Sequence, residues 1–406
     1  MKLLLKKLHC VRYVLEIRNS IKKKINRKKA HMHIKRVISN KKNGDSKIRV
    51  GFIVQLPAVW DKQSMIYEAA IERGMEAFLF VVPNGDDNTY EDNYFVKEYP
   101  NAIKICKGDN VDDLRKYELD YLFYPRPYDS YLPESIRSTN MAKYVRCCYI
   151  PYGFTASDAF DEENIYNDFF DNINICFMDS EYMKGKMKEK YRKENQKGLK
   201  LIEYLGYPCL EIYRSMGETN KVDTITWTPR WNYDERAGGS NFLEYKDIFL
   251  NICKSSEKKY IFRPHPLMFD ELVKKEFISA KEAKEYLDEL RRINVEIDLF
   301  SPIEKILERT DVLISDFSTI VGAFFMTGRP IIYCNKGIKL NPIYQEMSDF
   351  IYMVNNANEF VDEINKVVVE MQDEKHDKRV AYIDNVYKSN ENATEKILDF
   401  LCEKIA

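Results

Sequence analysis

Along most of the chain, two kinds of segment alternate, which differ in the spacing of their apolar residues. From residue 47 onward, short apolar runs typical of buried strands are separated by segments with apolar residues at helical spacing. In the first half these runs lie at 47–55, 76–83, 119–127, 142–153, 173–180 and 200–208. In the second half they lie at 224–231, 259–266, 295–300, 311–316 and 329–334.

Strands that alternate with helices predict parallel sheets covered by helices on both faces. A polar stretch at 216–223 predicts a linker between two such units. We therefore predict an α/β protein with two Rossmann-like, doubly wound domains, 47–215 and 222–375, that face each other across a cleft, followed by a helical segment at 376–406. No Gly-x-Gly-x-x-Gly follows the first strand, so a dinucleotide fingerprint is absent.

Residues 1–46 differ from the rest, because they have helical periodicity and a strong positive charge. The apolar positions at helical spacing are Leu4, Leu8, Val11, Leu15, Ile17, Ile21 and Ile25. Residues 1–48 hold 16 Lys and Arg against two acidic residues, which is an excess of 14 positive charges in a chain whose net charge is −1. This pattern predicts a basic amphipathic helix that lies on an anionic membrane through residues 1–45. A solvated helix and a basic RNA-binding arm are the alternatives.

Composition narrows the class of protein. The chain has 406 residues, of which 45% are hydrophobic, and its near-neutral charge argues against a dedicated nucleic-acid binder. Nine Cys without a Cys-x-x-Cys pair indicate free thiols in a reducing cytosol, and no His, Cys and acid spacing predicts a metal or other cofactor. No apolar stretch reaches about 20 residues, and MKLLLKKLHC does not resemble a signal peptide. We expect a cytoplasmic protein.

Polar side chains cluster after three expected strands of the second half. They are Thr228 and Arg230, on either side of Pro229, at the end of the first, Arg263 and His265 at the end of the second, and Ser315, Asp316, Ser318 and Thr319 at or just after the end of the fourth. The carboxyl ends of strands line the ligand crevice of an open α/β sheet. Guanidinium groups, an imidazole, hydroxyls and a helix start together suit a ligand that carries phosphates.

Each of these residues also has a simpler explanation. Asp316 or Ser318 can cap the following helix, for about 1 kcal/mol, and Arg263 can pair with a surface carboxylate. A single His at a strand end is more often structural than catalytic. Pro264 and Pro266, however, fix the backbone on both sides of His265 and deny it ladder hydrogen bonds, which favours a functional role for this imidazole.

Taken together, TWTPRW, FRPHPLM and DVLISDFSTIVGAFFMTGRPIIYC resemble the CDP-glycerol glycerophosphotransferase family, the peripheral membrane enzymes that make teichoic acids and related polyol-phosphate polymers. The resemblance covers about 222–400 and continues weakly in YIPYGF (149–154) and LGYP (205–208). It implies two Rossmann-like domains in the GT-B arrangement, with the donor nucleotide on the second. It also implies that His265, with Arg263 and Asp316, contacts the reacting phosphates and that 228–230, Ser315, Ser318 and Thr319 bind the donor.

Two motifs depart from the family pattern. Where the family has His-Gly-Thr-Pro in its first domain, this chain has Ile150-Pro151-Tyr152-Gly153, and the family's Asp-Gly-x-Ala-Ser is replaced by residues 390–394, NENAT. The imidazole taken as the catalytic base of the family is therefore missing. Tyr152, Asp61 and Asp158 are the candidates for the acceptor side, and the sequence does not choose among them.

The function implied by the resemblance is transfer of a polyol phosphate from a CDP-activated polyol to a lipid-linked or polymeric hydroxyl, with release of CMP, at the inner face of the cell membrane. Two alternatives are a GT-B glycosyltransferase that uses a nucleotide sugar and a non-catalytic protein that binds nucleotide or polymer. The polyol, the acceptor and the oligomeric state are left open by the sequence.

Overall fold

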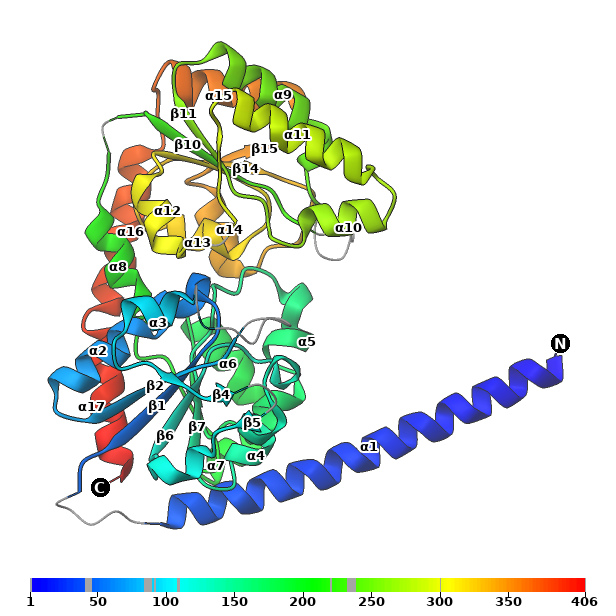
Figure 1. Ribbon diagram of the computed structural model, residues 1–406, viewed down its shortest axis with the longest axis vertical. Coiled ribbons are helices and arrows are strands. Elements are labelled where there is room, and N and C mark those ends of the chain that lie inside the picture. The colour runs from blue at the N-terminus through cyan, green and yellow to red at the C-terminus, as the bar shows by residue number, and fades with distance from the viewer. Residues whose placement is uncertain are drawn as a thin grey trace.

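The structure, a computed structural model, describes residues 2–40, 46–83, 90, 93–107, 110–219, 221–231, 239–299 and 301–405, with the side chains of 2–16 and Glu163 excepted. Two α/β halves are stacked on each other, and a long N-terminal helix extends away from the lower one (Figure 1). Helices α8 (Cys209–Met216) and α16 (His376–Asn390) run along one side and connect the halves.

The first half contains a seven-stranded parallel sheet in the order β3-β2-β1-β6-β7-β8-β9. Its strands are β1 (Arg49–Val54), β2 (Glu76–Val81), β3 (Ile103–Lys104), β6 (Tyr121–Tyr124), β7 (Arg146–Tyr149), β8 (Ile175–Phe177) and β9 (Leu201–Glu203). The strand order reverses between β1 and β6, which makes that pair the topological switch point. A short antiparallel pair, β4 (Cys106–Lys107) and β5 (Asn110–Val111), was not predicted.

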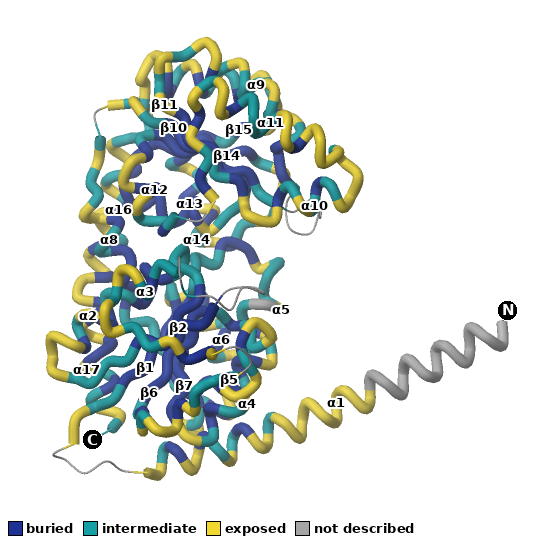
Figure 2. The backbone as a smooth tube through the Cα atoms, viewed as in Figure 1, coloured by how far each residue is buried: buried dark blue, intermediate teal, exposed yellow. Residues whose placement is uncertain are grey.

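The helices of the first half are α2 (Ser64–Glu72), α3 (Tyr94–Glu98), α4 (Ser138–Met141), α5 (Asp161–Asn164), α6 (Glu181–Lys190) and α7 (Arg192–Gln196), and short 3-10 turns include η1 (Pro57–Lys62) and η5 (Asp158–Phe160). Gly74 follows the end of α2 with φ of +75°, the left-handed conformation in which glycine commonly ends a helix. Strands β6, β7 and β8 are buried along their whole length, which is why they read as continuous apolar runs (Figure 2).

The second half contains a six-stranded parallel sheet in the order β12-β11-β10-β13-β14-β15, which is the Rossmann order, with its switch point between β10 and β13. The strands are β10 (Thr224–Thr228), β11 (Lys259–Phe262), β12 (Glu296–Ile297), β13 (Val312–Ser315), β14 (Ile331–Cys334) and β15 (Tyr352–Val354). The helices are α9 (Phe242–Ser255), α10 (Met268–Lys274), α11 (Ala280–Arg292), α12 (Ile303–Arg309), α13 (Thr319–Phe325), α14 (Pro342–Ser348) and α15 (Ala357–Ile364), the last continued by the π-helical turn η8 (Asn365–Val369).

Two local expectations in this half were wrong. The strand expected at 295–300 is only two residues long, and residue 300 lies outside the described residues. The segment 301–310, SPIEKILERT, predicts a helix with Ser301 as its N-cap and Pro302 at its first position, but the helix begins one residue later and Pro302 occupies the cap position.

Helix α17 (Ala393–Ile405) returns to the first half. The Tyr121 hydroxyl of β6 donates to the carbonyl oxygen of Leu401 at 2.6 Å, and the ring of Phe400 meets the edge of Phe177 with centroids 5.7 Å apart. The first sheet is therefore covered on one face by residues that follow the whole second half in sequence (Figure 1).

The N-terminal segment is one helix, α1 (Lys2–Ser39), as predicted, but among its described side chains, from Ile17 onward, the apolar residues do not form one continuous face; Leu4, Leu8, Val11 and Leu15 lie outside the described side chains. Ala30, Ile34 and Val37 are buried against the first half. Ile17, Ile21 and Ile25, which are 44–54% exposed, lie on the opposite side of the helix at 100° per residue. Basic residues also dock the helix, through ion pairs of Lys23 with Asp168 and of Arg27 with Glu194.

Candidate active site

The carboxyl ends of β10 and β13 lie side by side at the switch point of the second sheet. Thr228 pairs in register with Ser315, and its hydroxyl donates to the Ser315 hydroxyl at 2.7 Å. Both side chains are buried, and Ser315 donates onward to the carbonyl oxygen of Asp316 at 2.9 Å. The structure thus brings two of the predicted donor-binding motifs together, although the hydroxyls of Thr228 and Ser315 donate to protein atoms.

Asp316 is fully buried and organises this edge of the sheet. Its Oδ2 accepts from the backbone N–H of Arg230 at 2.8 Å, from the backbone N–H of Asn241 at 3.2 Å and from the Ser240 hydroxyl at 3.2 Å. Its Oδ1 accepts from Asn241 Nδ2 at 3.0 Å. Burial raises the pKa of Asp316, and these hydrogen bonds oppose the rise. With no exposed surface, the carboxylate positions the strand ends.

His265 is exposed at the end of β11, between the two prolines, with its ring 5.6 Å from that of Trp231. Its Nδ1 accepts from the backbone N–H of Leu267 at 3.2 Å, so the proton of the neutral ring is on Nε2. Desolvation, with the Arg230 charge as a smaller cause, lowers the pKa of His265, and the ring is neutral at pH 7. It is therefore a hydrogen-bond donor through Nε2.

Arg263 makes its contacts toward the edge strand β12. Its guanidinium forms an ion pair with Asp298 and donates to the carbonyl oxygen of Ser301 at 2.9 Å. These contacts join β11 to the segment between β12 and α12. Arg263 therefore stabilises the edge of the sheet, and His265, two residues later, is the exposed residue of this strand end.

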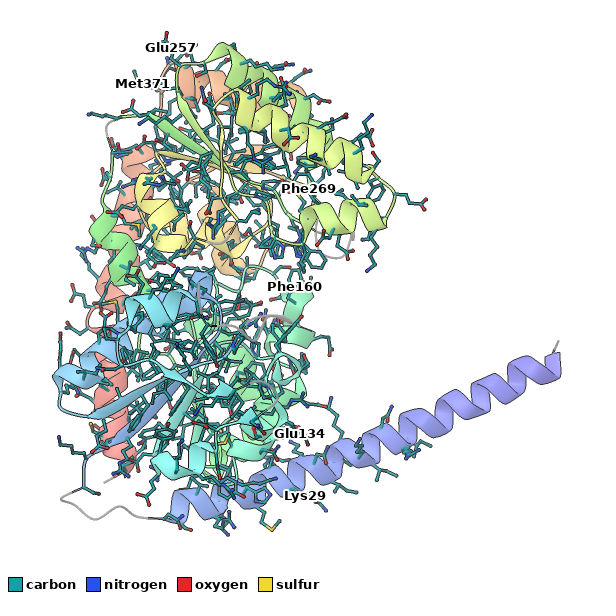
Figure 3. The ribbon with its side chains drawn as sticks, viewed as in Figure 1. Lys29, Glu134, Phe160, Glu257, Phe269 and Met371 are labelled. Carbon is teal, nitrogen blue, oxygen red and sulfur yellow. The ribbon has the colours of Figure 1, made fainter. Side chains whose placement is uncertain are left out.

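Arg230 lies where the two halves meet. Its Nη1 donates to the carbonyl oxygen of Phe317 at 2.8 Å, and its guanidinium lies 5.1 Å from the Phe317 ring centroid and 5.4 Å from that of Phe160. Phe160 comes from the first half, at the surface that faces the second (Figure 3), and stacks on Phe317 at 5.5 Å. The cation and two rings form a contact across the interface.

The loop after β7 forms a second contact between the halves. A Cβ at Gly153 would lie 2.8 Å from Thr319 Cγ2, so only glycine fits there. Asn341 donates to the carbonyl oxygen of Thr155 through Nδ2 at 2.5 Å. Ser318 caps α13 by accepting from the backbone N–H of Ile320 at 3.4 Å, as expected, and Thr319 is exposed beside it. The facing carboxyl edges of the two sheets thus meet around α13.

The three acceptor-side candidates have different surroundings. Tyr152 is half-buried, with its hydroxyl 3.2 Å from that of Tyr128. The Asp158 carboxylate accepts from Lys186 at 2.8 Å and from the Tyr182 hydroxyl at 2.9 Å, and these contacts outweigh desolvation to lower its pKa. Asp61 is buried and hydrogen-bonded to Lys62 and Tyr213. Of the three, Asp158 lies in the segment that contacts the second half, since the neighbouring Ser157 hydroxyl donates to the carbonyl oxygen of Lys339 at 2.6 Å.

A fourth candidate, the carboxylate of Asp179, was missed by the sequence reasoning. It follows β8 and is half-buried, and its Oδ2 accepts from the backbone N–H of Thr155, in the loop after β7, at 2.9 Å. Desolvation raises its pKa to about 6. The available signal was its position at the end of the expected strand 173–180, the same rule that selected His265.

Residues 206–403 match the family model of the CDP-glycerol:poly(glycerophosphate) glycerophosphotransferases. This region belongs to that family. The match confirms the resemblance seen in the motifs and makes the protein a transferase of phosphate-containing groups. The family region includes the strand ends at 228–230, 263–265 and 315–319, and it begins in the first half at Gly206.

Solved structures share the whole fold at low identity. The S. aureus MnaA–UDP co-structure matches with a TM-score of 0.55 and 11% identity over 87% of this chain and 95% of its own. The Methanocaldococcus jannaschii UDP-GlcNAc 2-epimerase in complex with UDP-GlcNAc and UDP matches with 0.52 and 12% over 88% and 100%. The wall teichoic acid polymerase TagF matches with 0.50 and 12% over 95% and 98%. These likenesses confirm the predicted GT-B-type fold. No curated protein sequence matches the chain.

Proposed function

We propose that the protein transfers a polyol phosphate from a CDP-activated polyol to a hydroxyl of a lipid-linked or polymeric acceptor. The acceptor oxygen attacks the distal phosphorus, the bond from that phosphorus to the bridging oxygen breaks, and CMP leaves with that oxygen. The observation that carries the proposal is His265, an exposed imidazole with its donor nitrogen defined, at the sheet edge of a glycerophosphotransferase domain.

Phosphoryl transfer requires positioning and neutralisation of charge on the phosphate oxygens more than covalent help. Nε2–H of His265 would donate to a phosphate oxygen, and the exposed Thr319 hydroxyl would add a second donor. Asp316 contributes indirectly, because it fixes the backbone of Arg230 and the turn before α9.

On the facing edge, Asp179 would take the proton of the attacking hydroxyl. A carboxylate with a pKa of about 6 is ionised at neutral pH and is a stronger base than an ordinary aspartate. Tyr152, which occupies the strand end where the family has its histidine, would orient the acceptor through its hydroxyl. The pKa of Asp158 is lowered by Lys186 and Tyr182, which makes it the weaker base of the two aspartates.

We place the reaction at the inner face of the cell membrane. Among the described helices, none is long and apolar enough to cross a bilayer. The exposed stripe Ile17, Ile21 and Ile25 on α1, with lysines on either side, suits adsorption to an anionic surface. The docked face of α1 would then keep the first half close to a lipid-linked acceptor.

The test is to incubate the protein with CDP-glycerol, CDP-ribitol, UDP-GlcNAc or a GDP-sugar and to follow nucleotide release when a lipid-linked polyol-phosphate acceptor is added. We expect CMP release from one CDP-polyol, and its near-complete loss in His265→Ala with an unchanged melting temperature. Release of UDP or GDP instead would establish a glycosyltransferase. Tight CMP binding without turnover on any acceptor would establish a binding protein.

A further inference from the structure

A second arginine-proline strand end lies at the switch point of the first sheet, and the reaction described above does not use it. Arg126 follows β6 and is half-buried, and Gln55, which is 5% exposed, follows the neighbouring strand β1. Gln55 Nε2 donates to the carbonyl oxygens of Pro83 and Tyr131, both at 3.1 Å. This leaves Gln55 Oε1 to accept from Arg126 Nη2, so the amide holds the guanidinium in place.

Aromatic rings surround the guanidinium. It lies 4.8 Å from the centroid of Tyr131, whose ring meets that of Tyr128 at 6.0 Å. Tyr128 in turn contacts the ring of Tyr152 at 6.1 Å and its hydroxyl at 3.2 Å. The cluster therefore joins Arg126 to Tyr152, the strand end proposed above to orient the acceptor.

Within the described parts of the chain, no carboxylate forms an ion pair with Arg126. Asp129, three residues further on, accepts instead from the backbone N–H and the hydroxyl of Ser138. Desolvation lowers the pKa of Arg126, and the tyrosines offset this only in part. A half-buried cation without a counterion is costly to maintain, and it is best explained by an anion that binds there.

We propose that Arg126, held by Gln55 and flanked by Tyr128, Tyr131 and Tyr152, binds a phosphate of the acceptor, and that the acceptor is a polyol-phosphate chain rather than an uncharged glycan. The guanidinium pairs with the phosphate oxygens, and the phenol hydroxyls accept from and donate to polyol hydroxyls. The identification of the bound phosphate as part of the acceptor rests on the proposed function, whereas the anion site itself rests only on the contacts of Arg126.

The surroundings of Tyr128 fit an extended acceptor. Tyr128 also lines a cavity of about 490 Å³, whose lining includes Lys23, Asn26, Lys29 and His33 of α1 together with the carboxylates of Asp129, Asp168 and Asp171. A polymer whose end lies at Tyr152 can thus continue past Tyr128 toward the basic helix. Lys29 there would meet a further phosphate of the same chain, whereas Lys23 is already paired with Asp168 at 2.7 Å.

The test measures binding of glycerol phosphate, inorganic phosphate and glycerol to the full chain, with CMP added to fill the nucleotide site. We expect the wild-type protein to bind glycerol phosphate more tightly than inorganic phosphate and to show no binding of glycerol. Arg126→Gln should weaken glycerol phosphate binding by at least about 10-fold, the usual effect of losing a charge-assisted contact, and Arg126→Lys by less.

Arg115→Gln is the matched control, because Arg115 also stacks on a tyrosine of the first half, at 5.3 Å, but is paired with Asp113. It should bind as the wild type does. Since no carboxylate of the described residues pairs with Arg126, Arg126→Gln should melt no lower than the wild type, whereas a structural arginine would lower the melting temperature. Glycerol phosphate binding that is absent from the wild type or unchanged in Arg126→Gln would overturn the site.

Equal binding of inorganic phosphate and glycerol phosphate would overturn the polyol part of the proposal. These measurements need no turnover, so they remain decisive if no CDP-polyol releases CMP. If CMP is released, Arg126→Gln should raise the acceptor KM by at least about 10-fold and leave the donor KM unchanged.

Discussion

Replacing Asp316 by Asn tests whether this carboxylate holds the donor edge or takes part in the chemistry. The amide oxygen can keep the three donors that meet Oδ2, from Arg230, Ser240 and Asn241. The amide nitrogen must then face Asn241 Nδ2, which is also a donor and already donates to the carbonyl oxygen of Cys334 at 2.8 Å. One charge-assisted hydrogen bond is lost and two donors oppose each other.

The loss of such a bond costs about 1.5–3 kcal/mol, and the three that remain become weaker when the charge is removed. The neutral amide is easier to bury than a carboxylate, which offsets part of this loss. We therefore expect Asp316→Asn to lower the free energy of unfolding by about 1–3 kcal/mol. Because the backbone of Arg230 and the turn before α9 are then less firmly held, CMP affinity should fall as well.

The assay combines urea unfolding with calorimetric titration of CMP. Asp311→Asn is the matched control, since Asp311 accepts from the backbone N–H groups of Asp223 and Thr224, both at 2.8 Å, at the opposite edge of the same sheet. It should lower stability without changing CMP affinity. A variant Asp316→Asn with unchanged stability and unchanged CMP affinity, but with kcat reduced by several orders of magnitude, would refute the positioning role and make Asp316 catalytic.

Three further predictions follow from the same contacts. Asp179 has a pKa raised to about 6, so turnover should rise with pH through about 6 and Asp179→Asn should abolish turnover. Because the folded state binds this proton more tightly than the unfolded state, the stabilising contribution of the protonated carboxyl is lost as pH rises from about 4 to 6. In thermal melts at pH 7.5, Asp179→Asn should therefore be at least as stable as the wild type. Arg329 donates to the carbonyl oxygens of Met216, Gly217, Leu307, Glu308 and Thr310, so Arg329→Met should lower the free energy of unfolding in urea by about 3–5 kcal/mol. The control Arg309→Met loses only a surface pair with Glu296 and should lower it by under about 1 kcal/mol. Equal effects of the two substitutions would contradict this prediction. Serine at Ile17, Ile21 and Ile25 should reduce sedimentation with anionic vesicles several-fold, while serine at the exposed Val369 and Met371 should not, and equal sedimentation of both variants would exclude the stripe as the membrane contact.

The sequence predicts the positions of the site well because parallel strands are buried along their length and place polar residues only where they end. This rule located Thr228, His265 and Ser315 at one edge, and the structure has them on neighbouring strands. The same rule applied to 173–180 indicates Asp179. Fold class follows from the same pattern, since two sets of alternating strands and helices admit few other arrangements.

The direction of each polar side chain could not be predicted, because it depends on partners far away in the sequence. Arg263 and Arg126 have similar sequence contexts, because each lies beside a proline at the end of an expected strand. Arg263 pairs with Asp298, and Arg126 is held by Gln55, which is neutral and lies 71 residues earlier. Asp61 is similar, because its burial with Lys62 depends on Tyr213 of α8.

The return of α17 to the first half has a consequence for how the protein is made. The face of the first sheet that contains Tyr121 and Phe177 is covered by Leu401 and Phe400, which the ribosome adds only after the entire second half. During synthesis the first half therefore exposes an apolar surface while the second half can already fold on its own strands. Newly made chains should depend on chaperones over this interval, and chains interrupted before residue 393 should aggregate through the first half.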